Sequence, residues 1–158
     1  MNIFDRIEQD HDAARKVIQD LKDTSNRAEK TRQKLFDHWK LDMWVHHKVE
    51  EAVFYSILRN TDEMHGDAME AYNEHHMANG MIEELDTFPV DSEEWAVKFG
   101  ALSELVDHHM KEEEDDFFPA ARKLLDKDTQ ELMGERFDAR KKVVMAALAP
   151  LELEEEPA

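Results

Sequence analysis

Two stretches of the chain repeat a pairing of histidine and glutamate that suits metal binding. His46 precedes Glu50 by four residues, and His109 precedes Glu113 by the same spacing. Residues four apart on an α-helix project from the same face, so each pair can present an imidazole and a carboxylate to one point. Imidazole and carboxylate ligands without sulfur suit iron, manganese or zinc.

A lone histidine precedes each pair, and the whole unit is duplicated. The segment DHDAARKVIQDL, which contains His11, matches EHHMANGMIEEL, which contains His75. The lone histidines lie 64 residues apart, and the histidines of the two pairs lie 63 apart. The chain is therefore two copies of one unit, each a helix with one His followed by a helix with His-x-x-x-Glu.

The helical register separates the doubled histidines. His46 and His109 fall on the apolar stripes of their helices, whereas His108 falls among acidic residues and His76 on the polar side of its helix. His47 lies one step off the stripe. We therefore expect His46 and His109 to face inward and His108 and His76 to face solvent.

The hydrophobic periodicity predicts five helices and no strands. Gly and Pro number only four each, and helix-forming residues dominate. The expected helices cover residues 3–23, 28–59, 62–87, 92–125 and 128–148. An Asp91-x-x-Glu94 pattern resembles a capping box before the fourth helix, and Pro119 is expected to kink that helix.

Four long helices with short connections predict an all-α, up-down-up-down four-helix bundle with an additional C-terminal helix. The metal-binding domain is expected over residues 1–148, followed by an acidic, disordered tail over 149–158. The fifth helix either packs outside the bundle or crosses one end. Its apolar residues are Leu132, Phe137, Val143, Val144 and Ala147.

Four inward histidines and two inward glutamates would be costly to bury without partners. A pair of divalent metals removes this cost, with two His on each metal and each Glu able to bridge both. A lone inward His is more often a satisfied core residue, but the repetition on four stripes favours the metal centre.

The pattern H…HxxxE…H…HxxxE resembles the hemerythrin-like (HHE cation-binding) domain over about residues 5 to 125. The resemblance implies a non-haem di-iron centre with two iron ions, oxo-, hydroxo- or carboxylate-bridged. The ligands that it implies are His11, His46, Glu50, His75, His109 and Glu113.

The chain departs from the oxygen-carrying hemerythrins, which have a second His four residues after the one in the third helix. Asn79 occupies that place here, which argues against simple reversible oxygen carriage. His47 is a candidate extra ligand, Asp42 a candidate acceptor for the His46 imidazole, and Tyr72 either a hydrogen-bonding neighbour of the site or core. An apolar cluster is expected from Trp39, Met43, Trp44, Phe54 and Phe117.

Composition excludes several functional classes. The absence of Cys excludes disulfides, zinc–thiolate sites, iron–sulfur clusters and thiol catalysis. A net charge of −18 opposes binding to nucleic acid or anionic membranes. No secretory signal or transmembrane segment is evident, so a cytoplasmic location is expected.

The sequence favours a protein that binds or reduces O2, NO or H2O2 for scavenging, sensing or detoxification. The alternatives are an iron donor in Fe–S cluster repair, disfavoured by the absence of Cys, and a di-iron oxidoreductase acting on an organic substrate. A structural bundle without metal is a further alternative. Whether the chain is an enzyme stays open, with oxidoreductase or peroxidase-like activity as candidates. The redox partner is unspecified, and a monomer or weak homodimer is expected.

Overall fold

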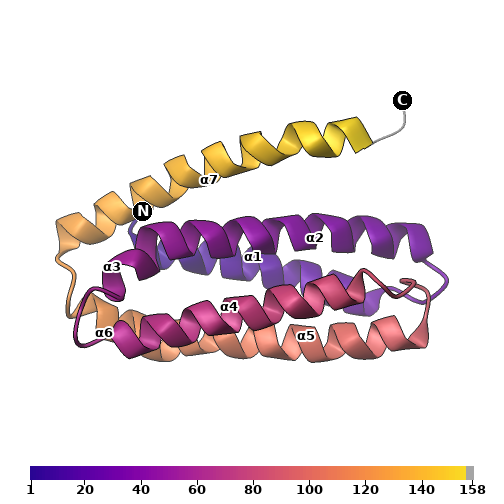
Figure 1. Cartoon of the computed structure of the whole chain (residues 1–158), viewed down its shortest axis with the longest axis horizontal. Helices are drawn as coiled ribbons and strands as arrows, with labels where there is room; N and C mark the ends of the chain where they lie inside the picture. Colours follow the sequence, from indigo (N-terminus) through magenta and orange to yellow (C-terminus); the bar gives the residue numbers. More distant parts are fainter. Residues whose placement is uncertain (156–158) are drawn as a thin grey trace.

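The computed structural model describes the backbone of residues 1–155 and the side chains of residues 1–148. It is an all-helical, up-down-up-down bundle with one additional helix (Figure 1). The elements are α1 (Ile3–Asp23), α2 (Glu29–Glu50), η1 (Glu51–Tyr55), α3 (Ser56–Leu58), α4 (His65–Leu85), α5 (Glu93–Glu112), η2 (Glu113–Phe117), α6 (Phe118–Arg122) and α7 (Lys127–Glu155). The predicted fold class is confirmed.

Helix starts follow from side-chain caps. The Asn2 side chain accepts a hydrogen bond from the backbone N–H of Asp5 at 2.9 Å, which begins α1. The Ser92 hydroxyl accepts from the N–H of Trp95 at 3.2 Å, which begins α5. The expected cap at Asp91 was therefore wrong by one residue, because Ser92 reaches the free N–H group of the first turn.

The second and fourth helices of the bundle each contain a π-helical turn, at places in the repeat that differ by one residue. The turn η1 begins directly after Glu50, and η2 begins at Glu113. Pro119 lies in the first turn of α6, directly after η2, and the kink expected there stays a prediction. Since η1 has no proline, Pro119 is not required for the turn. A π turn rotates the residues that follow it, and such turns are frequent at functional sites.

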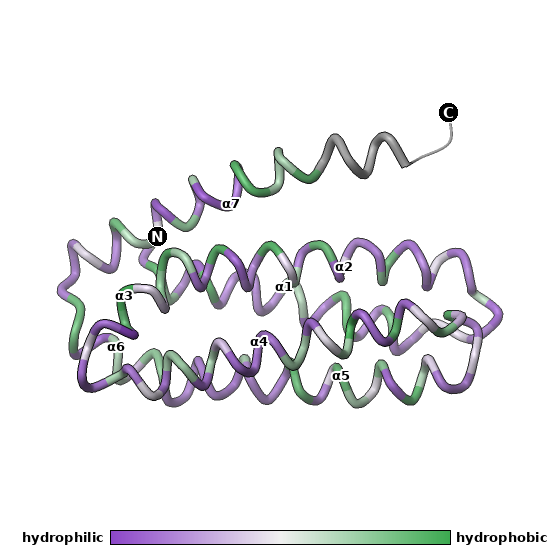
Figure 2. Tube along the Cα trace, viewed as in Figure 1, coloured by the Kyte–Doolittle hydropathy of each residue, from purple (hydrophilic) through white to green (hydrophobic). Residues whose placement is uncertain are grey.

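The core consists of two apolar clusters. One contains Phe4, Phe54 and Phe118 and lies at the end where α3 and α6 pack; the other contains Phe36, Trp39 and Trp95. Figure 2 shows hydrophobic residues recurring along each helix of the bundle between hydrophilic ones. The expected single cluster was wrong, because four of its members divide between these two and the fifth, Trp44, belongs to neither.

Helix α7 packs along α1 and α2. In Figure 1 its C-terminal half diverges from the bundle. Phe137 is fully buried, but Leu132 and Val143 are exposed, so the predicted apolar face was partly wrong; Met133 is the buried residue instead. Neighbouring Gly134 sits against the N-terminal backbone. The helix packs outside the bundle, one of the two expected arrangements.

Helix α7 continues past its predicted end at residue 148. The predicted tail, residues 149–158, lies outside the described side chains, and residues 156–158 lie outside the described backbone as well. Within the described residues, no helix is long and apolar enough to cross a membrane.

Candidate metal centre

The four bundle helices bring together all six side chains that the sequence singled out. His11 comes from α1, His75 from α4 and His109 from α5, and each is at least 95% buried. The pair His46 and Glu50 ends α2, with exposed fractions of 6% and 0%. Glu113, at the start of η2, is fully buried. Polar groups buried this completely need partners or metal ions.

Glu50 lies between the two halves of the repeat. Its Oε2 atom is 3.0 Å from Nε2 of His46, and its Oε1 atom is 3.0 Å from Nε2 of His75. Among the residues that the structure describes, three groups of side chains are close enough for each to hold one ion, and two of them are buried and share Glu50. The third, Glu74, His108 and Glu112, lies nearer the surface. The first group is His11, His46, Glu50 and Glu113, and the second is Glu50, His75 and His109. A carboxylate so placed can bridge two metals.

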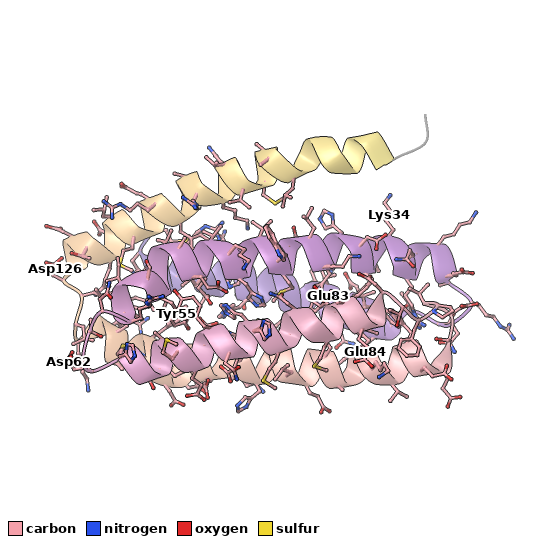
Figure 3. The ribbon with its side chains drawn as sticks, viewed as in Figure 1. Lys34, Tyr55, Asp62, Glu83, Glu84 and Asp126 are labelled. Carbon is pink, nitrogen blue, oxygen red and sulfur yellow. The ribbon has the colours of Figure 1, made fainter. Side chains whose placement is uncertain are left out.

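Glu113 is placed differently from Glu50. Its Oε1 atom lies 3.3 Å from Nε2 of His11 and 3.0 Å from Nε2 of His109. Its Oε2 atom accepts a hydrogen bond from the hydroxyl of Tyr55 at 2.6 Å. Figure 3 shows Tyr55 between the helices of the bundle. Oε1 of Glu113 therefore faces histidines of both halves, whereas Oε2 is occupied by the hydrogen bond from Tyr55.

Several atoms of this set have no hydrogen-bond partner among the described residues. They are Nε2 of His11, Nε2 of His46, both carboxylate oxygens of Glu50 and Oε1 of Glu113. The Nε2 atoms of His75 and His109 face each other at 3.1 Å. Convergent nitrogen and oxygen atoms without partners are the donor set that divalent metals require, so the residues fit a two-metal centre.

Each inward imidazole is held from behind by a carboxylate. The four Nδ1 atoms lie 2.7 or 2.8 Å from a carboxylate oxygen: His11 from Glu114, His46 from Asp10, His75 from Glu51 and His109 from Glu74. An Nδ1–H donated to a carboxylate leaves the Nε2 lone pair for a metal and fixes the ring orientation. All four Nε2 atoms are thus prepared in the same way.

These carboxylates follow the repeat and cross between its halves. Asp10 and Glu74 each precede a lone histidine and serve the paired histidine of the same half. Glu51 and Glu114 each follow an inward glutamate and serve the lone histidine of the other half. In each Glu-Glu pair, the first glutamate therefore belongs to the candidate ligands, and the second accepts from the Nδ1–H of a histidine.

Electrostatics in the metal-free protein favour charged pairs. Burial alone would lower the pKa of His46, but the negative charges of Glu50 and Asp10 outweigh it and raise the pKa to about 10. Burial would raise the pKa of Glu50, yet the surrounding imidazoles, His46 first, hold it well below its usual range. Protons thus occupy the place of cations beside these carboxylates, and bound metals would displace them.

The hemerythrin HHE cation binding domain family matches residues 2–121, which carry all six inward side chains. The chain belongs to this family. Helix α7 lies beyond the matched residues.

Two further proteins resemble this HHE-domain chain. A crystal structure of a hemerythrin HHE cation binding domain-containing protein from Mycobacterium kansasii covers 99% of this chain and 94% of its own, with a TM-score of 0.84 and 19% identity. At this identity the likeness shows the fold. A protein named DNA nickase from Nostoc sp. is 28% identical over 148 residues, which are 94% of this chain and 41% of that protein. The HHE chain therefore spans about two fifths of that relative's length.

His47 is a second buried histidine beside the inward set of the HHE domain. Its ring stacks on that of His75, with centroids 3.9 Å apart and planes 13° apart, and its Nδ1 atom has no partner among the described residues. Burial, followed by the neighbouring imidazoles, lowers its pKa well below the usual value. It lies outside both groups of candidate ligands, and its role as an extra ligand stays a prediction.

The expectations about supporting residues need correction. Asp42 does not support His46, because Asp10 from α1 takes that place and Asp42 lies near His38 instead. Tyr72 donates to the backbone carbonyl of Glu51 at 3.3 Å. The tyrosine that reaches an inward carboxylate is Tyr55, which sequence reasoning missed.

The remaining histidines and one tryptophan lie at the surface. His65, His76 and His108 are exposed, as the register predicted for His76 and His108. Trp44 is 39% exposed, so its expected place in the core was wrong.

Proposed function

We propose that this HHE-domain protein holds two iron ions and binds or reduces a small diatomic or peroxide ligand, namely O2, NO or H2O2. The observation that carries the proposal is the position of Glu50, whose two oxygens each lie 3.0 Å from an imidazole of a different half. The proposed ligands are His11, His46, Glu50, His75, His109 and Glu113. They supply few donors per ion, and iron with open coordination positions binds and activates small oxidants.

The protein's own groups would do three things at this centre. The carboxylates behind the histidines keep each Nε2 atom aimed inward. The apolar clusters on either side surround the centre with side chains that offer water no hydrogen-bond partner. The Tyr55 hydroxyl holds Oε2 of Glu113 and leaves Oε1 facing the histidines of both halves.

The alternatives are less well supported. A role as iron donor in Fe–S cluster repair would require iron to leave a site in which every candidate ligand is at least 94% buried. Oxidation of a large organic substrate would require more space than the cavity of about 170 Å³ beside His11 and His46. The net charge of −18 opposes a DNA phosphate backbone, so our proposal assigns no nucleic acid to this chain.

Metal content is the decisive test. The protein is purified without a metal-affinity tag, and iron, manganese and zinc per chain are measured together with the visible spectrum before and after anaerobic reduction and return to air. We expect about two irons per chain, one for each of the two groups that share Glu50. We also expect visible absorption bands that bleach on reduction and return in air. Colourless protein without metal, or with zinc alone, would refute the proposal.

Matched variants test the assignment of the ligands. His46→Ala and Glu50→Ala are each expected to lose most of the iron, because each removes a donor atom of the group that would hold the first ion. His65→Ala is the control, since its side chain is exposed and lies outside every group of side chains that could hold an ion among the described residues. Equal iron content in His46→Ala and His65→Ala would overturn the assignment.

A further inference from the structure

A chamber of about 170 Å³ lies beside the metal centre on the side of the first half. Its lining includes His11 and His46, which are two of the four candidate ligands for the first ion. A cavity needs about 10–15 Å³ of such volume to hold one water, so this one has room for several. The chamber is therefore large enough for a diatomic or a peroxide.

The lining changes character from the outer to the inner end. His38, Asp42 and Lys141 line it and are partly or largely exposed, with side-chain exposures of 70%, 44% and 29%. The buried lining includes Trp39 and Met110, each 1% exposed. The chamber thus runs from a polar mouth, where α7 contributes Lys141, to a mostly apolar floor beside the imidazoles.

The two halves of the repeat differ at this place. In the alignment that pairs His46 with His109, His47 is equivalent to Met110. The His47 ring stacks on the His75 ring, with centroids 3.9 Å apart. Its counterpart Met110 instead lines the chamber beside the first half. Methionine is flexible and adapts to an occupant, whereas a stacked imidazole does not.

Lys141, at the mouth of the chamber, contacts the metal centre through Asp10. Its ammonium donates to Oδ1 of Asp10 at 2.9 Å, and Oδ2 of the same carboxylate lies 2.8 Å from Nδ1 of His46. Arg6 also donates to Oδ1 of Asp10, at 2.7 Å. Lys141, the cation of the lining, is thereby paired with a carboxylate, and Asp42 adds a negative charge to the mouth, so an uncharged ligand fits better than an anion.

We propose that small uncharged ligands reach the centre through this chamber, with Met110 at the inner end and Lys141 at the mouth. The proposal rests on the proposed function, because it assigns the route for that same ligand.

Blocking the chamber tests the route. Ala14 and Val17 line it on α1 and are neither candidate ligands nor partners of one. In iron-loaded, reduced protein, Ala14→Phe is expected to lower the association rate constant of nitric oxide at least tenfold, with iron content unchanged. Val17→Trp fills the same space and replaces Ala14→Phe if that variant does not fold. Val97→Phe, on an exposed site of α5, is the control and is expected to bind at the unchanged rate.

Xenon gives a readout that does not depend on iron. In xenon-pressurised crystals of the metal-free protein, we expect a xenon atom beside Trp39, and none in Ala14→Phe. Absence of xenon in the unaltered protein would refute the chamber as a binding space. An unchanged nitric oxide rate in Ala14→Phe, despite loss of the xenon site, would refute the route. Iron content is measured first, so failure to bind iron refutes the proposed function separately and removes the route with it.

Discussion

The carboxylates behind the histidines predict a measurable loss of metal affinity when their charge is removed. In the unaltered protein, Nδ1 of His11 lies 2.7 Å from Oε2 of Glu114. In Glu114→Gln the side chain keeps its length, and its amide oxygen can still accept the Nδ1–H of His11. The negative charge is lost, so the imidazole becomes a weaker donor to a metal. Glu51→Gln makes the same change behind His75, in the other half.

The size of the effect follows from the surroundings. Loss of a partner behind a metal-binding histidine typically lowers metal affinity about 10- to 100-fold, or about 1.4 to 2.7 kcal/mol. Arg15 donates to both oxygens of Glu114 at 2.9 and 3.0 Å and already offsets part of its charge. We therefore expect about tenfold for Glu114→Gln, near the lower end of that range. Glu51 has no such close cation, as Lys48 lies 3.9 Å away, so Glu51→Gln should lose more.

Competition with a chromophoric chelator measures the two affinities. Glu114→Gln should weaken the ion held by His11, and Glu51→Gln the ion held by His75, so the double variant should show both losses, roughly additive. Asp115→Asn is the matched control, because Asp115 is exposed and neighbours Glu114 in the chain. Affinities of Glu114→Gln within twofold of the unaltered protein, or an equal loss in Asp115→Asn, would refute the reasoning.

Three further predictions concern stability and pH. Tyr55→Phe should lower the free energy of unfolding of the metal-free protein by about 1.5–3 kcal/mol, because Glu113 loses a buried hydrogen bond; a change below about 0.5 kcal/mol in denaturant titration would contradict this. Since the pKa of His46 is raised to about 10, metal binding at pH 7 should release its proton and tighten as pH rises toward 10, by about tenfold per unit for each proton released. Calorimetry in buffers of different ionisation enthalpy measures that release, and affinity independent of pH between about 6 and 9 would contradict it. Gly134→Ala should destabilise the fold by about 1–3 kcal/mol, because its Cβ would overlap the backbone of the N-terminus. The control Gly80→Ala, with open space around it, should stabilise the fold by up to about 1 kcal/mol in thermal unfolding.

The inward residues were predictable because helical periodicity and internal repetition constrain each other. A spacing of four places His46 beside Glu50 whatever the tertiary structure, and the aligned aromatics distinguish His109 from His108. Burial of the six side chains follows that register. Their assignment as metal ligands stays a prediction.

The groups behind the histidines were not predictable in the same way. Asp42 lies one turn from His46 on the same helix, yet Asp10 on α1 is its partner. Such a choice depends on the stagger between neighbouring helices, which periodicity does not specify. A signal was nevertheless present, since an acid precedes each lone histidine and a second Glu follows each inward one.

The π turns and the register of α7 were also beyond sequence reasoning. An α-helical register extended past Glu50 does not show that Tyr55 will reach Glu113, since η1 adds an offset there. On α7, the apolar residues are spread around the helix, so packing against α1 and α2 decides that Met133 is buried and Leu132 exposed.

The crossing of Glu51 and Glu114 between the halves has a consequence for how such a centre can diversify. One half alone could complete the same set of contacts only by pairing with an identical copy, and strict symmetry would then force the same residue on both sides. Joining the halves through the short connection between α3 and α4 makes their encounter intramolecular, with an effective concentration on the order of millimolar or above. The fusion also allows the two halves to carry different residues at equivalent positions. Tyr55 opposite Phe118, and His47 opposite Met110, are differences that only a fused pair can carry.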